Sequence, residues 1–245
     1  MQPQTLKSST IEAYQRCPRQ YAYSSIYRFT SESDGYQLFW QATQKTVESL
    51  RARMQESKQT GTLPSQQEAR ELYTRHWQEL GGSDAPFGPM YEEHGHEIVE
   101  TVRRTLSTRE DITWDTRPQF NVDVAGKTVH VTIDRVESAA PSEDKPTRFV
   151  RTRFGKRKDK PTADTRELFY TLAYRQLHPG QSVELHSHNM STGEVAPIPL
   201  SAKKEQSLRD EVEQSIHGLE EHAYPARPAE PFRCPTCPFF LICTA

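Results

Sequence analysis

The sequence contains few cysteines and no long apolar run, and both absences narrow the class of protein. Only four of its 245 residues are cysteines, and no stretch approaches the ~20 consecutive apolar residues that span a bilayer. The first residues, Met1 to Lys7, lack the apolar segment of a secretory signal peptide. These features disfavour a membrane protein and a disulfide-rich secreted domain, so we expect a cytoplasmic protein in a reducing compartment, with no membrane partner.

Two further signals are missing from the sequence. The ATP-binding loop G-x-x-x-x-G-K-[S/T] does not occur, so any motor activity that this protein serves must lie elsewhere. Internal repeats and low-complexity tails are absent as well. With 34% hydrophobic and 26% charged residues, the chain is polar but long enough to bury a core, as one large domain or two small ones.

Acidic and basic residues nearly balance overall, but basic residues are concentrated in one stretch. The formal net charge is −2, which by itself says nothing about nucleic acid. Between residues 145 and 160, however, eight basic residues stand against a single acid, Asp159. Such a segment makes a local positive patch, which is either a solvated hairpin tip or a surface for a polyanion. Its basic residues are Lys145, Arg148, Arg151, Arg153, Lys156, Arg157, Lys158 and Lys160.

The four cysteines lie at opposite ends of the chain. Cys234, Cys237 and Cys243 form the pattern C-x2-C-x5-C, and Cys17 stands alone near the start. This arrangement is an odd disulfide framework but suits a four-thiolate metal site. Because zinc sites more often use two close pairs, the 3+1 spacing favours an iron–sulfur cluster; zinc and unrelated buried or disulfide cysteines are the alternatives. A metal held this way would join the two chain ends as a structural staple.

The first 110 residues have the pattern of a helical layer. Residues Ser9 to Glu12 form a potential capping box that opens a short helix ending near Pro18. An aromatic-rich second helix is expected over 19–29. Apolar residues at 3–4 spacing then predict three longer helices, over 36–58, 66–80 and 91–106.

Alternation with period two begins after residue 112 and predicts β-strands. Two strands, over 119–124 and 128–136, flank Ala125-Gly126 as a hairpin. Three more strands are expected over 148–154, 182–190 and 194–200, with helices over 165–177 and 203–224. The order predicts one α/β domain over 1–245, built on a small mixed sheet: a helical N-terminal part (1–110), a mixed-sheet core (111–200), and a C-terminal helix with the cysteine cluster (201–245).

The two ends of the sequence resemble those of the iron-staple nucleases, the RecB/AddB-like branch of the PD-(D/E)xK superfamily. The likeness lies in the opening Thr10-Ile-Glu-Ala-Tyr14-Gln-Arg-Cys17-Pro-Arg-Gln-Tyr21 and in the terminal cysteine segment, and it covers nearly the whole chain. The family includes the CRISPR-adaptation nucleases and the C-terminal domains of some UvrD/PcrA-like helicases. The resemblance implies a restriction-endonuclease-like fold and a 4Fe–4S cluster held by Cys17, Cys234, Cys237 and Cys243.

The nuclease motifs of that family are mostly replaced in this sequence. Gln44 stands where the family has a helical histidine, whereas Asp134, in Thr132-Ile-Asp-Arg135, matches the aspartate of the next motif. The third motif, Asp/Glu-x-Lys-Thr-Gly, aligns with Arg151-Thr-Arg153-Phe-Gly155, so both of its working residues are arginines. The Gln-x-x-x-Tyr of the following helix appears as Arg166 to Tyr170, which keeps only the tyrosine.

These replacements predict an inactive nuclease. The chemistry needs carboxylates to hold Mg²⁺ or Mn²⁺ and a lysine to orient the attacking water. A guanidinium in place of the second ligand repels the ion by on the order of several kcal/mol, and arginine does not deprotonate. The alternative is an active metal-dependent DNA exonuclease with displaced ligands, for which the candidates are Glu137, Glu143 and Asp144 near the strands and His94, His96 and Glu97 on a helix.

The leading prediction is therefore a non-catalytic DNA-binding module with a structural 4Fe–4S cluster. Arginine makes bidentate contacts to phosphate, so the basic stretch is predicted to contact single-stranded or forked DNA through Arg148, Arg151, Arg153, Lys156, Arg157, Lys158 and Lys160. Phe154, Tyr170 and Tyr174 are interpreted as core residues, with base stacking as the alternative.

The resemblance also implies partners. Its members usually follow helicase motor domains, so we expect such a motor in the same or a partner chain, within a recombination or repair assembly. The short lead before the capping box is compatible with a domain cut from a longer polypeptide. A scaffold that binds a protein and touches no DNA is the third hypothesis.

Overall fold

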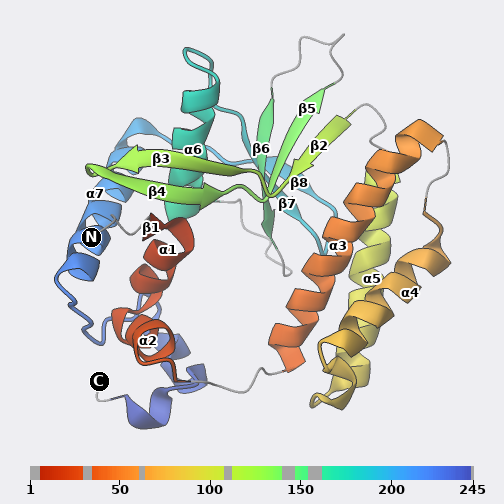
Figure 1. Ribbon diagram of the computed structural model, residues 1–245, viewed down its shortest axis with the longest axis horizontal. Coiled ribbons are helices and arrows are strands. Elements are labelled where there is room, and N and C mark those ends of the chain that lie inside the picture. The colour runs from red at the N-terminus through yellow and green to blue at the C-terminus, as the bar shows by residue number, and fades with distance from the viewer. Residues whose placement is uncertain are drawn as a thin grey trace.

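The chain forms a layer of long helices beside two small β-sheets, with shorter helices near both termini. The computed structural model describes residues 6–29, 35–60, 64–107, 112–139, 147–153 and 162–243. In Figure 1 the helical layer lies on one side of the strands, and the N- and C-terminal segments lie together on the other side. Among the helices in these ranges, none is long and apolar enough to cross a membrane.

The helical layer consists of α3 (Gly35–Thr60), α4 (Gln66–Glu79) and α5 (Gly88–Ser107), which confirms the three long helices expected from the sequence. A capping box starts α4, because Ser65 Oγ accepts from the Glu68 N–H and Glu68 Oε2 accepts from the Ser65 N–H. The three helices share one hydrophobic core, which includes Phe39, Val47, Leu50, Leu72, Tyr73, Trp77, Ile98, Val99, Val102 and Leu106.

Two mixed sheets replace the single sheet expected from the sequence. The first has the order β1-β4-β3, formed by β1 (Leu6–Lys7), β4 (Lys127–Thr132) and β3 (Gln119–Val124). The second has the order β2-β5-β6-β7-β8, formed by β2 (Ile112–Thr116), β5 (Arg135–Ala139), β6 (Arg148–Arg153), β7 (Leu185–Asn189) and β8 (Val195–Pro197). In the second sheet, β6 and β7 are parallel and the other neighbours antiparallel.

The strand predicted over 128–136 is in fact two strands that belong to different sheets. The ladder of β4 stops at Thr132, and β5 starts at Arg135. Between them, the Ile133 N–H donates to the Pro118 carbonyl at 3.0 Å, and the Asp134 carbonyl accepts from the Arg117 N–H at 3.3 Å. Because these backbone groups bond outside a continuous ladder, the chain turns here from one sheet into the other.

The remaining helices pack mainly on the first sheet and on one another. They are α1 (Ser8–Arg16), α2 (Pro18–Tyr21), the π-helix η1 (Ala22–Ile26), α6 (Thr165–Leu177) and α7 (Ala202–Glu220), followed by the 3₁₀ turns η3 (Pro231–Thr236) and η4 (Phe240–Ile242); a further 3₁₀ turn, η2 (Gly82–Asp84), precedes α5. A second hydrophobic core lies between α1, α6, α7 and the strands, and includes Ile11, Val129, Phe149, Leu168, Phe169, Tyr174, Val212 and Ile216.

Two local predictions differ from the structure. The expected capping box at Ser9 does not form: the N-cap of α1 is Lys7, without a side-chain bond, since β1 leads directly into the helix. The strand β2 was not expected, although its sequence, Ile-Thr-Trp-Asp-Thr, is rich in β-formers. Helix α6 has the bounds expected, because its apolar face follows the capping residue Asp164 without interruption.

Candidate functional site

Asp134 lies at the turn between the two sheets, where its side chain is fixed against β6. Its Oδ2 accepts from the Thr152 N–H at 2.8 Å, and its own N–H donates to Tyr170 Oη at 2.8 Å. The two residues that match the family motifs are therefore in contact. Tyr170 is 1% exposed, and burial, followed by the charge of Asp134, raises its pKa well above the ordinary value. Tyr174 is likewise fully buried, which confirms the core interpretation of both tyrosines.

Arg151 and Arg153, on either side of Thr152, both contact one buried carboxylate. Arg151 Nη1 donates to the two oxygens of Glu167 at 2.7 Å, and Arg153 Nη2 donates to Glu167 Oε1 at 3.0 Å. The Glu167 side chain is 0% exposed, and Oε2 also accepts from the Asp164 N–H. Arg151 bonds Asp164 Oδ2 as well, at 2.7 Å. The two arginines thus point to the start of α6.

The electrostatics of this group favour the ionised forms of Arg151 and Asp164, whereas burial disfavours that of Glu167. Burial raises the pKa of Glu167, and the Arg151 guanidinium opposes that shift. Burial would also raise the pKa of Asp164, but bonds from Glu167 and Arg151 leave it below the ordinary value. Burial alone would lower the pKa of Arg151, yet the two carboxylates raise it. Arg151 therefore stays a cation whose charge is compensated within the chain.

A third arginine, Arg166, lies beside Asp134 itself. Its Nε and Nη2 donate to the carboxylate of Glu12 on α1, and its Nη1 is 4.0 Å from Asp134 Oδ1. Burial opposes ionisation, but Glu12 and Asp134 together raise the pKa of Arg166. A divalent cation bound at Asp134 would therefore meet a guanidinium already beside the same carboxylate.

We call this group the Asp134 site: Glu12, Asp134, Arg151, Arg153, Asp164, Arg166 and Glu167. It contains three arginines and four carboxylates joined by the contacts above. Within the described ranges, no group of three or more Cys, His, Asp and Glu side chains could hold a metal ion. The arrangement can therefore position charge and bind the first turn of α6 to the sheet.

Helix α3 presents no histidine to this region. Gln44, at the position of the family histidine, is exposed and donates to Glu48 Oε1 at 3.1 Å, and Glu48 also pairs with Arg117. Deeper in the fold, Arg135 and Glu137 form a fully buried ion pair, with Arg135 Nη2 3.2 Å from His188 Nδ1. Glu48 thus joins α3 to the turn that follows β2, whereas the buried Arg135 group lies within the second sheet.

The residues predicted to contact DNA have different surroundings. Lys145, Lys156, Arg157, Lys158 and Lys160 lie outside the described residues, as does Phe154. Arg148 is half-buried on β6. Arg151 and Arg153 are mostly buried and bonded to Glu167, with 17% and 19% of their side chains exposed, so their contact with DNA stays a prediction.

The alternative metal ligands do not form a site where the structure describes them. Glu137 is buried in its pair with Arg135. On α5, His94 pairs with Glu97 at 3.1 Å, whereas His96 is buried and lies 3.3 Å from Thr74 Oγ1. Glu143 and Asp144 lie outside the described residues.

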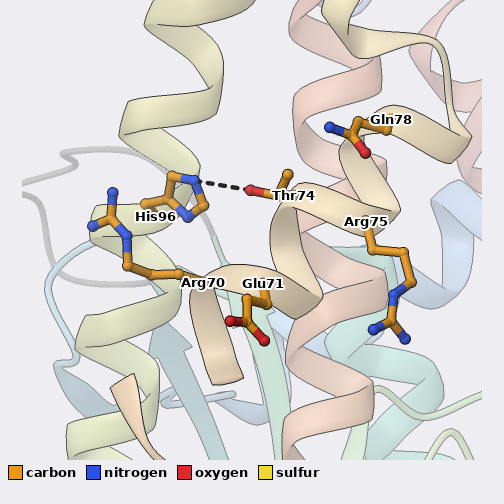
Figure 2. Close-up of a pocket in the computed structure, with 6 residues that line it drawn as sticks. All are labelled: Arg70, Glu71, Thr74, Arg75, Gln78 and His96. Carbon is orange, nitrogen blue, oxygen red and sulfur yellow. Dashed lines mark hydrogen bonds between the residues drawn. The ribbon is translucent and has the colours of Figure 1, made fainter. Parts of the chain in front are cut away.

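His96 also lines a pocket of about 350 Å³ on the outer side of the helical layer. Figure 2 shows that α4 supplies the other lining residues, and marks the contact of His96 with Thr74. Burial lowers the pKa of His96, which keeps the ring neutral. The lining mixes both charge signs and is remote from Asp134, so the pocket gives no reaction chemistry. Its residues are Arg70, Glu71, Thr74, Arg75, Gln78 and His96.

The four cysteines are free thiols on segments that contact each other. Cys17 separates α1 from α2, and the other three cysteines lie in or beside η3 and η4. The segments meet where the Ala229 N–H donates to the Arg16 carbonyl at 2.9 Å and Tyr23 Oη donates to the Ile242 carbonyl at 3.1 Å. Four unpaired thiols suit an iron–sulfur cluster in kind, and their segments are adjacent, although the described arrangement does not gather three of them as ligands.

Sequence reasoning missed Glu12, Asp164 and Glu167 as members of the Asp134 site. Glu167 had one usable signal: with Asp164 it forms the pattern D-x-x-E of a capping box, and both bonds of that box are present. Glu12 was predicted to cap α1, but its carboxylate accepts from Arg166, 154 residues away in sequence. No local pattern reports such a contact.

Comparisons with known proteins agree with this fold. The model of the PD-(D/E)XK nuclease superfamily matches residues 6–244, and no curated protein matches the sequence. The crystal structure of a "Putative exonuclease" from Eubacterium rectale has a TM-score of 0.58 at 10% identity, covering 93% of this chain and 85% of that chain, which shows the fold alone. A crystal structure of SSO0001 has 13% identity and covers 100% of this chain and 87% of that chain. Its TM-score of 0.40 is too low to indicate a shared fold. Because the family model spans nearly the whole sequence, the chain belongs to the PD-(D/E)XK nuclease superfamily.

Proposed function

We propose that this domain is an inactivated member of the superfamily that binds DNA without cutting it. The observation that carries the proposal is Glu167, a buried carboxylate bonded by both Arg151 and Arg153. These arginines stand where the third motif has a carboxylate and a lysine. Asp134 therefore has no second carboxylate on β6 to share a metal ion, and it has Arg166 at 4.0 Å instead.

Binding to DNA is proposed for the residues of the basic stretch that form no ion pair with Glu167. Arg148 and the four basic residues at 156, 157, 158 and 160 remain the candidates from the basic stretch. Each phosphate that such a side chain neutralises releases counterions, so affinity should fall steeply with salt. The paired Arg151 and Arg153 serve the architecture of the site and contribute little to this term.

The proposal includes a 4Fe–4S cluster held by Cys17, Cys234, Cys237 and Cys243. When bound, such a cluster would supply a covalent link between the chain ends and no reaction chemistry. The unpaired thiols and the contact between their segments support it. Anaerobically purified protein should contain iron and acid-labile sulfide and absorb visible light; zinc without iron would instead support the zinc alternative.

A place in a helicase or recombination-repair assembly is the least direct part of the proposal. It rests on the resemblance of the cysteine-bearing ends to domains that follow helicase motors. Co-purification of the tagged full chain with a motor ATPase from its own cells would support it, and a complex without any nucleic-acid enzyme would favour the scaffold hypothesis.

The test is a binding and cleavage assay on cluster-replete protein with labelled single-stranded, duplex and forked DNA, in Mg²⁺ and in Mn²⁺. We expect binding at low salt and no cleavage product. An Asp134→Asn variant is the matched control, because it removes the charge of the one remaining motif carboxylate at nearly constant volume.

Three outcomes would overturn the proposal. Metal-dependent cleavage by the wild type that Asp134→Asn abolishes would show an active exonuclease. Absence of binding to every DNA form at low salt would leave the scaffold hypothesis. Cleavage that Asp134→Asn leaves unchanged would support displaced ligands if it co-elutes with the protein in gel filtration, and this would also overturn the proposal. Cleavage that elutes apart from the protein comes from a contaminating nuclease and leaves the proposal standing.

A further inference from the structure

The surface formed by the two chain ends displays aromatic side chains to solvent. Tyr27 is 54% and Phe29 46% exposed at the end of η1, and Phe240 is 51% exposed at the start of η4. We call the exposed side chains of residues 23–29 and 239–242 the terminal surface. Tyr23 joins its two parts, because its ring lies 5.4 Å from that of Phe239 and its hydroxyl bonds the Ile242 carbonyl.

The rings on this surface are held by the backbone. Arg28 adopts a φ of +56°, in the left-handed region that non-glycine residues rarely occupy. This turn allows the Phe29 N–H to donate to the Tyr23 carbonyl at 2.9 Å, and it stacks the two rings with 5.6 Å between centroids. Tyr27 and Phe29 lie 6.0 Å apart. The result is a small platform of ordered rings with a guanidinium between them in sequence.

The two chain ends carry more cations than carboxylates. Residues 6–29 and 222–243 contain six Lys and Arg and only two carboxylates. Both carboxylates are engaged, Glu12 with Arg166 and Glu230 with Arg233. Among the residues that the structure describes, no carboxylate forms an ion pair with the five remaining cations, which are Lys7, Arg16, Arg19, Arg28 and Arg227.

Another exposed aromatic group serves as a comparison. Tyr36 and Phe87, at the start of α3 and just before α5, are 52% and 73% exposed. The charges that follow them on α5 are those of Glu92 and Glu93. Exposed rings without cations suit many partners, whereas two exposed rings on either side of an exposed guanidinium suit the bases and a phosphate of a single strand.

We infer that the terminal surface binds single-stranded nucleic acid, with bases stacked on Tyr27 and Phe29 and a backbone phosphate at Arg28. The inference rests on the proposed DNA-binding function and adds both the place of the strand and the contribution of base stacking. Duplex DNA, whose bases are stacked on one another, cannot use this platform without opening.

The test compares a labelled short oligothymidylate with an abasic oligonucleotide of the same length, by fluorescence anisotropy on the cluster-replete full chain. Tyr27→Leu and Phe29→Leu remove the ring and keep an apolar side chain; each should weaken oligothymidylate binding about five- to tenfold and leave abasic binding unchanged. Arg28→Gln should weaken both ligands and lower the logarithmic salt slope by about 0.7. Phe87→Leu is the matched control and should change neither affinity.

Failure of this inference can be told from failure of the proposed function. If Tyr27→Leu and Phe29→Leu bind oligothymidylate as the wild type does, the terminal surface is not the platform, while DNA binding itself stands. If the wild type binds no DNA, both fall. If the ring substitutions convert a dimer into a monomer in sedimentation without changing affinity for oligothymidylate, the surface is a protein interface and the inference is overturned. Unchanged melting temperatures would exclude misfolding as the cause of a loss.

Discussion

The Asp134 site and the terminal surface both contain arginine, yet among the residues that the structure describes only the first brings carboxylate partners to its guanidiniums. Arg151, Arg153 and Arg166 are bonded to Glu167 and Glu12. Arg28, in contrast, lies exposed between two aromatic residues, and no carboxylate in the described part of the chain forms an ion pair with it. The comparison shows that a cluster of arginines in a sequence is a positive surface only where the fold brings no acids to it.

Burial explains the difference between the two regions. A guanidinium removed from water needs a compensating charge, because its desolvation costs several kcal/mol in a folded protein. The first turn of α6 supplies that charge through Asp164 and Glu167. An exposed guanidinium keeps its water and needs no partner, so the chain ends can carry unpaired cations at little cost.

The largest expected effect concerns the link between the chain ends. If a cluster joins Cys17 to the terminal cysteines, Cys17→Ser should abolish the visible absorbance and destabilise the domain by about 5 kcal/mol or more, since binding of such a metal group contributes to folding. Urea unfolding followed by circular dichroism measures this. Wild type stripped of metal by a chelator is the control and should melt with the variant. An unchanged melting temperature in Cys17→Ser would refute the staple.

The next largest effect concerns the stability that Glu167 provides to the two arginines bonded to it. Glu167→Gln leaves Arg151 and Arg153 with one fewer buried anion and should lower the free energy of unfolding by about 3 kcal/mol. Glu213→Gln, on the exposed side of α7, should change it by less than about 0.5 kcal/mol. Equal stabilities of the two variants in urea would mean that the Asp134 site does not depend on its carboxylate.

Acid should weaken the helical layer before it reaches the Asp134 site. Burial, followed by the charge of Lys45, lowers the pKa of His76 from 6.5, and burial also lowers that of His96. Below about pH 6.5 the unfolded chain takes up protons that the folded histidines resist, so stability falls as the pH falls, by at most about 1.4 kcal/mol per pH unit for each histidine. The carboxyl of Asp164, with its pKa lowered, keeps its contribution until far more acid pH.

Unfolding by urea at pH 7.5, 6.5 and 5.5 in wild type and in His76→Gln checks this order, at about the pH values where histidine titrates. The slope of stability against pH should be smaller in the variant. A slope that His76→Gln leaves unchanged would assign the acid sensitivity to other groups.

The sequence predicted the long elements better than their contacts. Helix α6 has the bounds expected, Thr165–Leu177, because a cap and an apolar face are local signals. The strand expected over 128–136 is interrupted at Asp134, because the N–H of Asp134 donates to Tyr170 Oη, 36 residues away in sequence, and not to a neighbouring strand.

Several residues of the candidate site could be predicted from the sequence, but their ion pairs could not. Alignment with the family motifs located Asp134, Arg151, Arg153 and Tyr170 in the sequence. The same reasoning interpreted the two arginines as phosphate ligands. Their sequence neighbours do not indicate the bonds to Glu167, because Glu167 lies on the next helix. Charge compensation across elements is a tertiary property.

The salt dependence of single-strand binding tests the central contrast most directly. Two variants each remove one guanidinium: Arg28→Gln from the terminal surface, and Arg151→Gln combined with Glu167→Gln from the Asp134 site, where the matched loss of one anion keeps the net charge. The account predicts that the logarithmic slope of affinity against salt falls by about 0.7 in the first variant and is unchanged in the second. An unchanged slope in Arg28→Gln together with a reduced slope in the double variant would contradict it.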